Sequence, residues 1–198
     1  MDITGSEALI GWFVLTPCIA IAAVFSVLAF FLRPAVFLWL AIIGLALALL
    51  ASSLLYEVDP SGYGPVVAVL AIVTAAFGGG PAASWTLGAA MGGTATPGQH
   101  GGIIVTDRWR PGTERPVTEA RREVLRGGQT IGLLERIATA GVILAGFPEG
   151  LAIVIAVKGV GRFTELESAE TRERFIIGTL ASLIWACSAA LVGWLAIR

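Results

Sequence analysis

Charged side chains are scarce in this sequence, and their scarcity excludes a soluble globular domain. Only 14% of the 198 residues are charged, whereas 56% are hydrophobic. Soluble domains carry about 25% charged residues, because a folded surface in water needs a polar shell. We therefore expect a membrane protein whose main partner is the lipid bilayer. The net charge of −1 gives no reason to expect a nucleic-acid partner.

Histidine and cysteine are also rare, which argues against a metal site. His100 is the single histidine and lies in a glycine-rich stretch, while Cys18 and Cys187 fall within apolar runs. Cysteines in such runs are typical of small packing residues. We expect no metal and no cofactor, because zinc sites need several His and Cys ligands at defined spacings.

Catalytic motifs are missing as well. The Gly-Gly-Gly-Pro segment at residues 78–81 is not a phosphate-binding loop, since no Lys-Ser or Lys-Thr follows it at the required spacing. There is no Gly-x-Ser-x-Gly element, and one histidine makes a Ser-His-Asp set improbable. No catalytic residue is assigned, and a protein that is not an enzyme is favoured.

Long uncharged runs are abundant, and each is long enough to cross a bilayer core of about 30 Å. They predict an all-α, polytopic transmembrane bundle with five or six membrane segments, forming a single membrane domain over residues 1–198. The acidic start of the chain and the length of the first run argue against a cleaved signal peptide. The expected spans are 8–32, 35–56, 65–91 and 175–197, with a helical hairpin at 129–147 and 150–163.

Residues 78–81 and 92–128 interrupt this pattern in different ways. Pro81 and the glycines before it should kink or break the third span, and could line a cavity. Residues 92–128 form an arginine-rich loop that we expect in the cytoplasm. Within it, residues 117–126 could form a short surface helix.

Charge distribution predicts the topology. Arg33 and the arginine-rich loop should be cytoplasmic by the positive-inside rule. A reversal at Pro148, Glu149 and Gly150 returns four basic residues to the same side and leaves only Arg198 outside. The four are Lys158, Arg162, Arg172 and Arg174. The expected protein lies in the inner membrane with both termini outside. Because 150–163 is short, this arm either spans the membrane or is re-entrant.

Small residues recur at every fourth position in two spans. Gly44, Ala48 and Ser52 do so in the second span. In the last span, the residues are Gly178, Ser182, Ala186 and Ala190. Such stripes allow close approach of helix backbones. They predict packing within the bundle, with homo-oligomerisation through the same face as the alternative.

Charged residues around the hairpin are the candidate site. If the turn is centred between Pro148 and Glu149, then Glu135 lies level with Arg162, and Lys158 lies one turn nearer the bend. We expect Glu135, Lys158 and Arg162 to form one polar cluster, with Glu135 bonded to Arg162. Arg136 would then point to lipid headgroups or to the arginine-rich loop, because neighbouring side chains diverge around a helix. Ionisable groups in or near a membrane raise a functional hypothesis.

The same region carries a family resemblance. It contains Gly-Leu-Leu-Glu-Arg at 132–136, Lys-Gly-Val-Gly-Arg-Phe at 158–163 and Ile-Gly-Thr-Leu-Ala-Ser at 177–182. Residues 128–190 thereby resemble the C-terminal region of a family of bacterial integral membrane proteins that carries only a domain-of-unknown-function label. The resemblance implies the hairpin topology and draws attention to its charged residues, but it implies no activity.

Three functions remain open on the sequence alone. The leading one is a small non-enzymatic membrane protein, which acts as an accessory or scaffold subunit with a membrane-protein partner or forms a homo-oligomer. The alternative is a small transporter or channel component that uses the broken third span and the charged hairpin. A lipid-modifying enzyme is third. A dry core with paired charges would favour the non-enzymatic membrane protein. A polar cavity that reaches the membrane midplane would favour the transporter or channel component. A cleft with Glu135 and several arginines would favour the lipid-modifying enzyme.

Overall fold

The computed structural model describes residues 11–54, 62–91, 103–106, 121–124, 128–162 and 169–198. A π-helical turn, Gly11–Leu15, leads into the first of six α-helices in this part of the chain. The helices are α2 (Thr16–Leu32), α3 (Ala35–Leu54), α4 (Gly64–Ala90), α5 (Gly128–Leu144), α6 (Gly150–Arg162) and α7 (Ala169–Ala196).

Four helical segments are long and apolar enough to cross a membrane: Phe13–Leu32, Ala35–Leu54, Gly64–Ala90 and Thr171–Ala196. Exposed leucine, isoleucine and valine side chains on these helices give the bundle an apolar outer surface. Such a surface suits lipid rather than water. The predicted class, a polytopic transmembrane helical bundle with a C-terminal helical hairpin, is confirmed.

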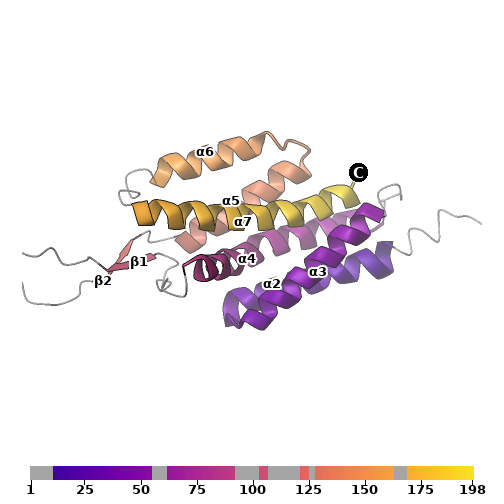
Figure 1. Ribbon diagram of the computed structural model, residues 1–198. Helices are drawn as coiled ribbons and strands as arrows, with labels where there is room; N and C mark the ends of the chain where they lie inside the picture. The colour runs from indigo at the N-terminus through magenta and orange to yellow at the C-terminus, as the bar shows by residue number, and fades with distance from the viewer. Residues whose placement is uncertain (1–10, 55–61, 92–102, 107–120, 125–127, 163–168) are drawn as a thin grey trace, which may run out of the picture.

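Helices α4 and α7 pack most extensively on each other and form the centre of the bundle. Helices α2 and α3 pair along one side of this centre, while α5 lies on the other side and carries α6 outside it (Figure 1). Alanine makes much of the interior, including Ala22, Ala41, Ala75 and Ala186, all of which are fully buried. Small side chains let the helices approach closely.

Gly44 marks a close approach between α2 and α3. A Cβ atom at this position would lie 2.9 Å from the backbone nitrogen of Ala22 and 3.2 Å from the carbonyl oxygen of Cys18. Ala48 and Ser52, on the same stripe, are also buried. The predicted stripe of the second span is therefore a contact between neighbouring helices of one chain.

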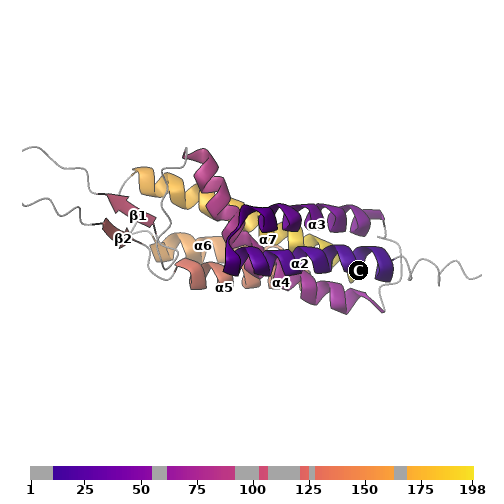
Figure 2. The same cartoon turned by 90° about the horizontal axis from the view of Figure 1, so that it is seen from below.

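Helix α4 is continuous through Pro81 but changes direction part-way along its length (Figure 2). Proline has no N–H to donate and displaces the preceding turn, which bends a helix. Side chains from other helices bind the carbonyl groups just before the bend. The Trp185 indole donates to the Thr74 oxygen at 2.9 Å, and Arg136 Nε donates to the Ala76 oxygen at 2.7 Å. The expected kink is present, and two buried donors stabilise it.

The reversal between α5 and α6 is closed by Gly146, which has a φ of +72°. The Phe147 N–H donates to the Val142 oxygen and the Gly146 N–H to the Ile143 oxygen. This pair of hydrogen bonds is the Schellman ending, which favours glycine at the left-handed position. Pro148 and Glu149 lie in the turn, and Gly150 is already the first residue of α6.

The arginine-rich loop differs from one expectation. Strands β1 (Ile103–Thr106) and β2 (Arg121–Val124) pair antiparallel, with Ile103 opposite Val124. The short surface helix expected at residues 117–126 is therefore wrong over 121–124, where pairing with β1 replaces a helical conformation. The remaining residues of that expected helix lie outside the described part of the chain.

The stripe on the last span packs inside the molecule. Ala186 and Ala190 are fully buried, Ser182 is 7% exposed, and a Cβ atom at Gly178 would lie 3.3 Å from Leu87 of α4. Intramolecular packing accounts for this face, so a homo-oligomer would have to use another surface.

Candidate functional site

A pocket of about 500 Å³ lies at the end of the bundle where α2 meets α3, where α4 ends, and where α5 and α7 begin. We call this end the pocket end. Its volume is within the range of small-molecule sites, roughly 300–1,000 Å³. The charged residues that line it are Arg33, Glu135, Arg136, Lys158 and Arg174.

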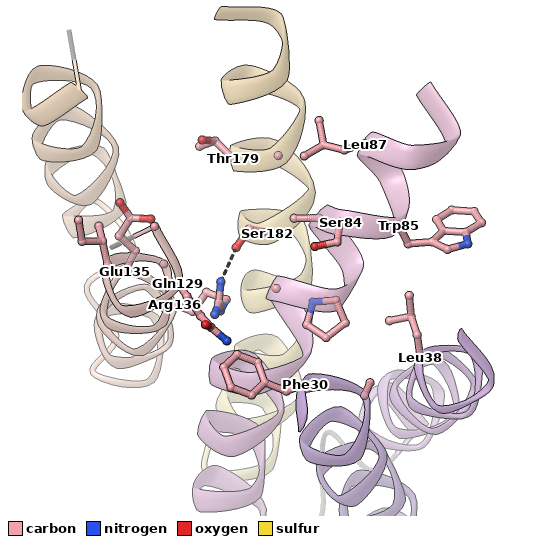
Figure 3. A pocket seen from close by; sticks show the side chains of 18 of the residues that line it. Phe30, Leu38, Ser84, Trp85, Leu87, Gln129, Glu135, Arg136, Thr179 and Ser182 are labelled. Atoms are coloured by element: carbon pink, nitrogen blue, oxygen red, sulfur yellow. Dashed lines mark hydrogen bonds between the residues drawn. The ribbon is translucent and has the colours of Figure 1, made fainter. Parts of the chain in front are cut away.

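Arg136 is the most deeply placed of these charges. It is 4% exposed and reaches from α5 towards α4 and α7 (Figure 3). Besides the Nε bond to Ala76, its Nη1 donates to Ser182 Oγ at 3.2 Å. A guanidinium group has five N–H donors. The described residues accept two of them, and both acceptors are neutral oxygens.

Glycine makes room for this guanidinium group. A Cβ atom at Gly79 would lie 2.3 Å from Arg136 Cδ, and one at Gly132 would lie 3.1 Å from Nη1. The neighbouring Gly78 makes the same allowance for Trp185, at 2.3 Å. The Gly-Gly-Gly-Pro segment thus admits an arginine and a tryptophan against the α4 backbone, besides preceding the kink.

Arg136 corrects a prediction. It does not point to lipid headgroups or to the arginine-rich loop, but into the bundle. The argument that neighbouring side chains diverge was sound, since Glu135 and Arg136 do point to different partners. Arg136 turns inward because it donates to the Ala76 carbonyl beside the kink. No pattern in the sequence of α5 predicts this contact with another helix.

Glu135 bonds Lys158, across the two arms of the hairpin. Both side chains are largely buried, with 13% and 17% exposed. Residues 135 and 158 are symmetric about a point between Gly146 and Phe147, whereas the prediction centred the turn between Pro148 and Glu149. Because Gly146 ends α5 early, the register shifts towards Lys158, which the prediction named only as the second partner.

The predicted bond between Glu135 and Arg162 involves a side chain outside the described part of the structure, and it stays a prediction. Lys158 makes a further contact that the sequence did not suggest. Its ammonium group lies 5.8 Å from the centre of the Phe175 ring, a cation–π arrangement. The contacts of Lys158 therefore connect α6 with both α5 and α7.

The pocket combines positive charge with apolar walls. Among the described residues that line it, four are cationic and one is anionic. Its walls include Phe30, Leu38, Trp85 and Leu87. Gly128 and Gln129 add the first turn of α5, where unpaired backbone N–H groups carry partial positive charge. This combination suits a ligand with a negative group and an apolar portion.

Two cations of the pocket were missed as site residues. Arg33 caps α2 in a left-handed conformation, with a φ of +65°, and is exposed at the rim. Arg174 is 7% exposed, in the second turn of α7. They are far apart in the sequence, and each resembled a charge at the end of a membrane span.

Among the described residues, no group of three or more His, Cys, Asp or Glu side chains could hold a metal ion. No family model matches the chain, and no curated protein or solved structure is similar to it. The resemblance noted for residues 128–190 stays a prediction. What the site binds has to follow from its own geometry.

Proposed function

We propose that this protein is a non-enzymatic membrane protein that binds an anion in the cationic pocket, as an accessory or sensor subunit. The observation that carries the proposal is the four-to-one excess of cations over anions among the described lining residues. Like charges gathered in one site repel each other, and a bound anion relieves that repulsion.

Arg136 supports an anion rather than a cation or a neutral ligand. A buried guanidinium group is costly unless its charge is compensated and its donors are used. Its two described acceptors are neutral, and its remaining donors are in a side chain that lines the pocket. A phosphate or carboxylate group offers the paired oxygens that a guanidinium group binds best.

The pocket contains Glu135 and three arginines, Arg33, Arg136 and Arg174, which is the arrangement expected for a lipid-modifying enzyme. The contacts of its polar groups nevertheless fit binding without catalysis. Glu135, the carboxylate of the site, is occupied by Lys158. Ser182 accepts a hydrogen bond from Arg136. An active nucleophile needs an adjacent general base, and neither residue shows one in the described part of the chain.

The other end of the bundle argues against a transport pathway. The residues buried there include Leu15, Ile19, Val67 and Val192, which are apolar and at most 1% exposed. A channel or transporter needs polar surface near the membrane midplane. The positive-inside rule places the pocket end in the cytoplasm, with both chain termini outside the inner membrane.

Anion binding to the purified full chain tests the proposal. Sodium phosphate should raise the unfolding temperature saturably, compared with sodium chloride at equal ionic strength. Arg33→Gln should weaken the apparent affinity about five-fold, which corresponds to about 1 kcal/mol. Arg33 is the residue of choice because it is exposed at the rim, so its loss should leave the fold intact.

Arg172→Gln is the matched control. Arg172 is an exposed arginine on α7, close in sequence to Arg174, and does not line the pocket. The substitution Arg172→Gln removes the same charge from the same end of the bundle. The phosphate affinity of this variant should stay within about two-fold of the wild type. Equal losses in the two variants would mean that phosphate senses only the general charge of this end.

A further inference from the structure

Residues of both α2 and α5 line the pocket. Both helices pack on α4, yet they scarcely touch one another. Phe30 of α2 and Ile131 of α5 line the pocket from the two sides. Their neighbours Phe31 and Leu134 are 67% and 61% exposed, so the outer surfaces beside the cleft are apolar. A cleft between two such apolar surfaces would open towards the bilayer.

Gly80 lies where the polar and apolar parts of the pocket meet. A Cβ atom there would be 3.7 Å from Arg136 Nη2 and 3.8 Å from two carbon atoms of the Phe30 ring. The missing side chain leaves space next to both groups. Figure 3 shows Phe30, from α2, near the side chain of Arg136, from α5.

From this arrangement we infer that the anion is the phosphate head of a membrane lipid, which reaches Arg136 sideways through the cleft between α2 and α5. The acyl chains stay in the bilayer, against Phe30 and Ile131. The inference rests on the proposed anion binding and adds the source of the anion and its route.

Two features favour a lipid head over free phosphate. The first is the volume of about 500 Å³, which leaves space beside a single phosphate ion for the glycerol of a lipid head. The second is the apolar wall formed by Phe30, Leu38 and Ile131, which a hydrated ion would leave unused. Basic pockets between membrane helices bind anionic lipid headgroups by this combination.

Lipid binding to the delipidated full chain in a neutral detergent tests the inference. Phosphatidylglycerol should raise the unfolding temperature and remain bound in native mass spectrometry, whereas phosphatidylcholine should do neither at the same concentration. Ile131→Trp, which narrows the mouth of the cleft, should weaken phosphatidylglycerol binding about ten-fold. Inorganic phosphate, which is small enough to pass, should bind this variant as it binds the wild type.

Ile137→Trp is the matched control. Ile131 and Ile137 are both 42% exposed on α5, but only Ile131 lines the pocket. The control should bind phosphatidylglycerol within about two-fold of the wild type. Equal weakening by both substitutions, or equal stabilisation by the two lipids, would overturn the lateral lipid site. If phosphate binds while phosphatidylglycerol does not, the inference fails and the anion site stands. If neither binds, the proposed function fails as well.

Discussion

The two ends of this bundle use the same helices but pack them in opposite ways. At the end where α3 finishes and α4 begins, which we call the closed end, Leu15, Ile19, Val67 and Val192 are at most 1% exposed. A Cβ atom at Gly193 would lie 2.8 Å from Leu144 Cδ2 and 3.0 Å from Ala71 Cβ. The pocket end instead contains the buried side chains of Arg136 and Arg174.

Glycine shows what this difference means. At Gly44 and Gly193, the absence of a side chain brings helices together. At Gly78 and Gly79, it admits the long side chains of Trp185 and Arg136 against the α4 backbone. The same residue type therefore closes one end and makes room for charge at the other. Polar groups at the pocket end are supported by specific contacts, which is typical of a binding site.

The largest expected effect comes from filling the space that Arg136 occupies. In Gly79→Ala, the new methyl group would overlap Arg136 Cδ, so the arginine has to leave the Ala76 oxygen. We expect a loss of about 3 kcal/mol of stability from overpacking and the unpaired buried groups. Thermal unfolding in detergent measures it. Gly88→Ala is the control, because a Cβ atom there meets nothing within 4 Å. Similar melting temperatures for the two variants would show that Arg136 adapts freely.

A second substitution tests the packed stripe of α7. Ala186→Leu adds three carbons where no side chain surface is exposed, and should cost about 2 kcal/mol. Ile184→Leu, at a position that is 66% exposed, should change stability by less than about 0.5 kcal/mol. Leu183 lies off the stripe but is unsuitable as a control, because it is only 8% exposed. The folded fraction after detergent extraction reports both variants, and equal yields would contradict a special contact face.

A smaller effect should follow from reversing the ion pair of the hairpin. Glu135→Lys places two ammonium groups together and should destabilise the protein by about 1–2 kcal/mol. Lys158→Glu in the same chain restores the pair with reversed charges and should recover much of that loss. A double-mutant cycle with zero coupling would show that the contact contributes nothing. A second cycle, with Arg162→Glu in place of Lys158→Glu, tests whether Arg162 interacts with Glu135.

The last prediction concerns the topology, which determines the side of the membrane that each end of the bundle faces. The cysteine substitutions that test it should leave the stability of the protein unchanged. Single cysteines at Glu149 and at the C-terminus should be labelled from outside the cell. Cysteines at Arg33 and Arg172 should be labelled only after the membrane is permeabilised. If the cysteines at positions 172 and 149 are labelled from the same side, the chain does not reverse across the membrane at the hairpin.

Local patterns were enough to predict most of the fold. The helices follow the uncharged runs closely, and Pro148 marked a reversal within the C-terminal apolar stretch. The register of the hairpin was wrong by a few residues, because the sequence does not show that Gly146 takes the left-handed ending of α5.

The candidate site could be predicted only in part. Glu135 and Lys158 lie on the two arms of one hairpin, so their spacing about the turn predicts that they lie close together. Arg33 and Arg174 join them only when α2, α5 and α7 pack around α4, and that arrangement depends on long-range packing. The inward turn of Arg136 depends on a carbonyl of another helix. Contacts of this kind leave no periodic signal in a single sequence.

Photocrosslinking tests the central claim most directly, that the pocket end binds an anionic lipid while the rest of the surface faces bulk bilayer. A phosphatidylglycerol analogue with a diazirine near its glycerol is added to the full chain in nanodiscs, and the adducts are mapped by mass spectrometry. The account predicts adducts concentrated on residues 28–33 and 128–136 and displaced by unlabelled phosphatidylglycerol, not by phosphatidylcholine. Adducts spread equally over Leu47 and Ile184, which are exposed but do not flank the cleft, would contradict it.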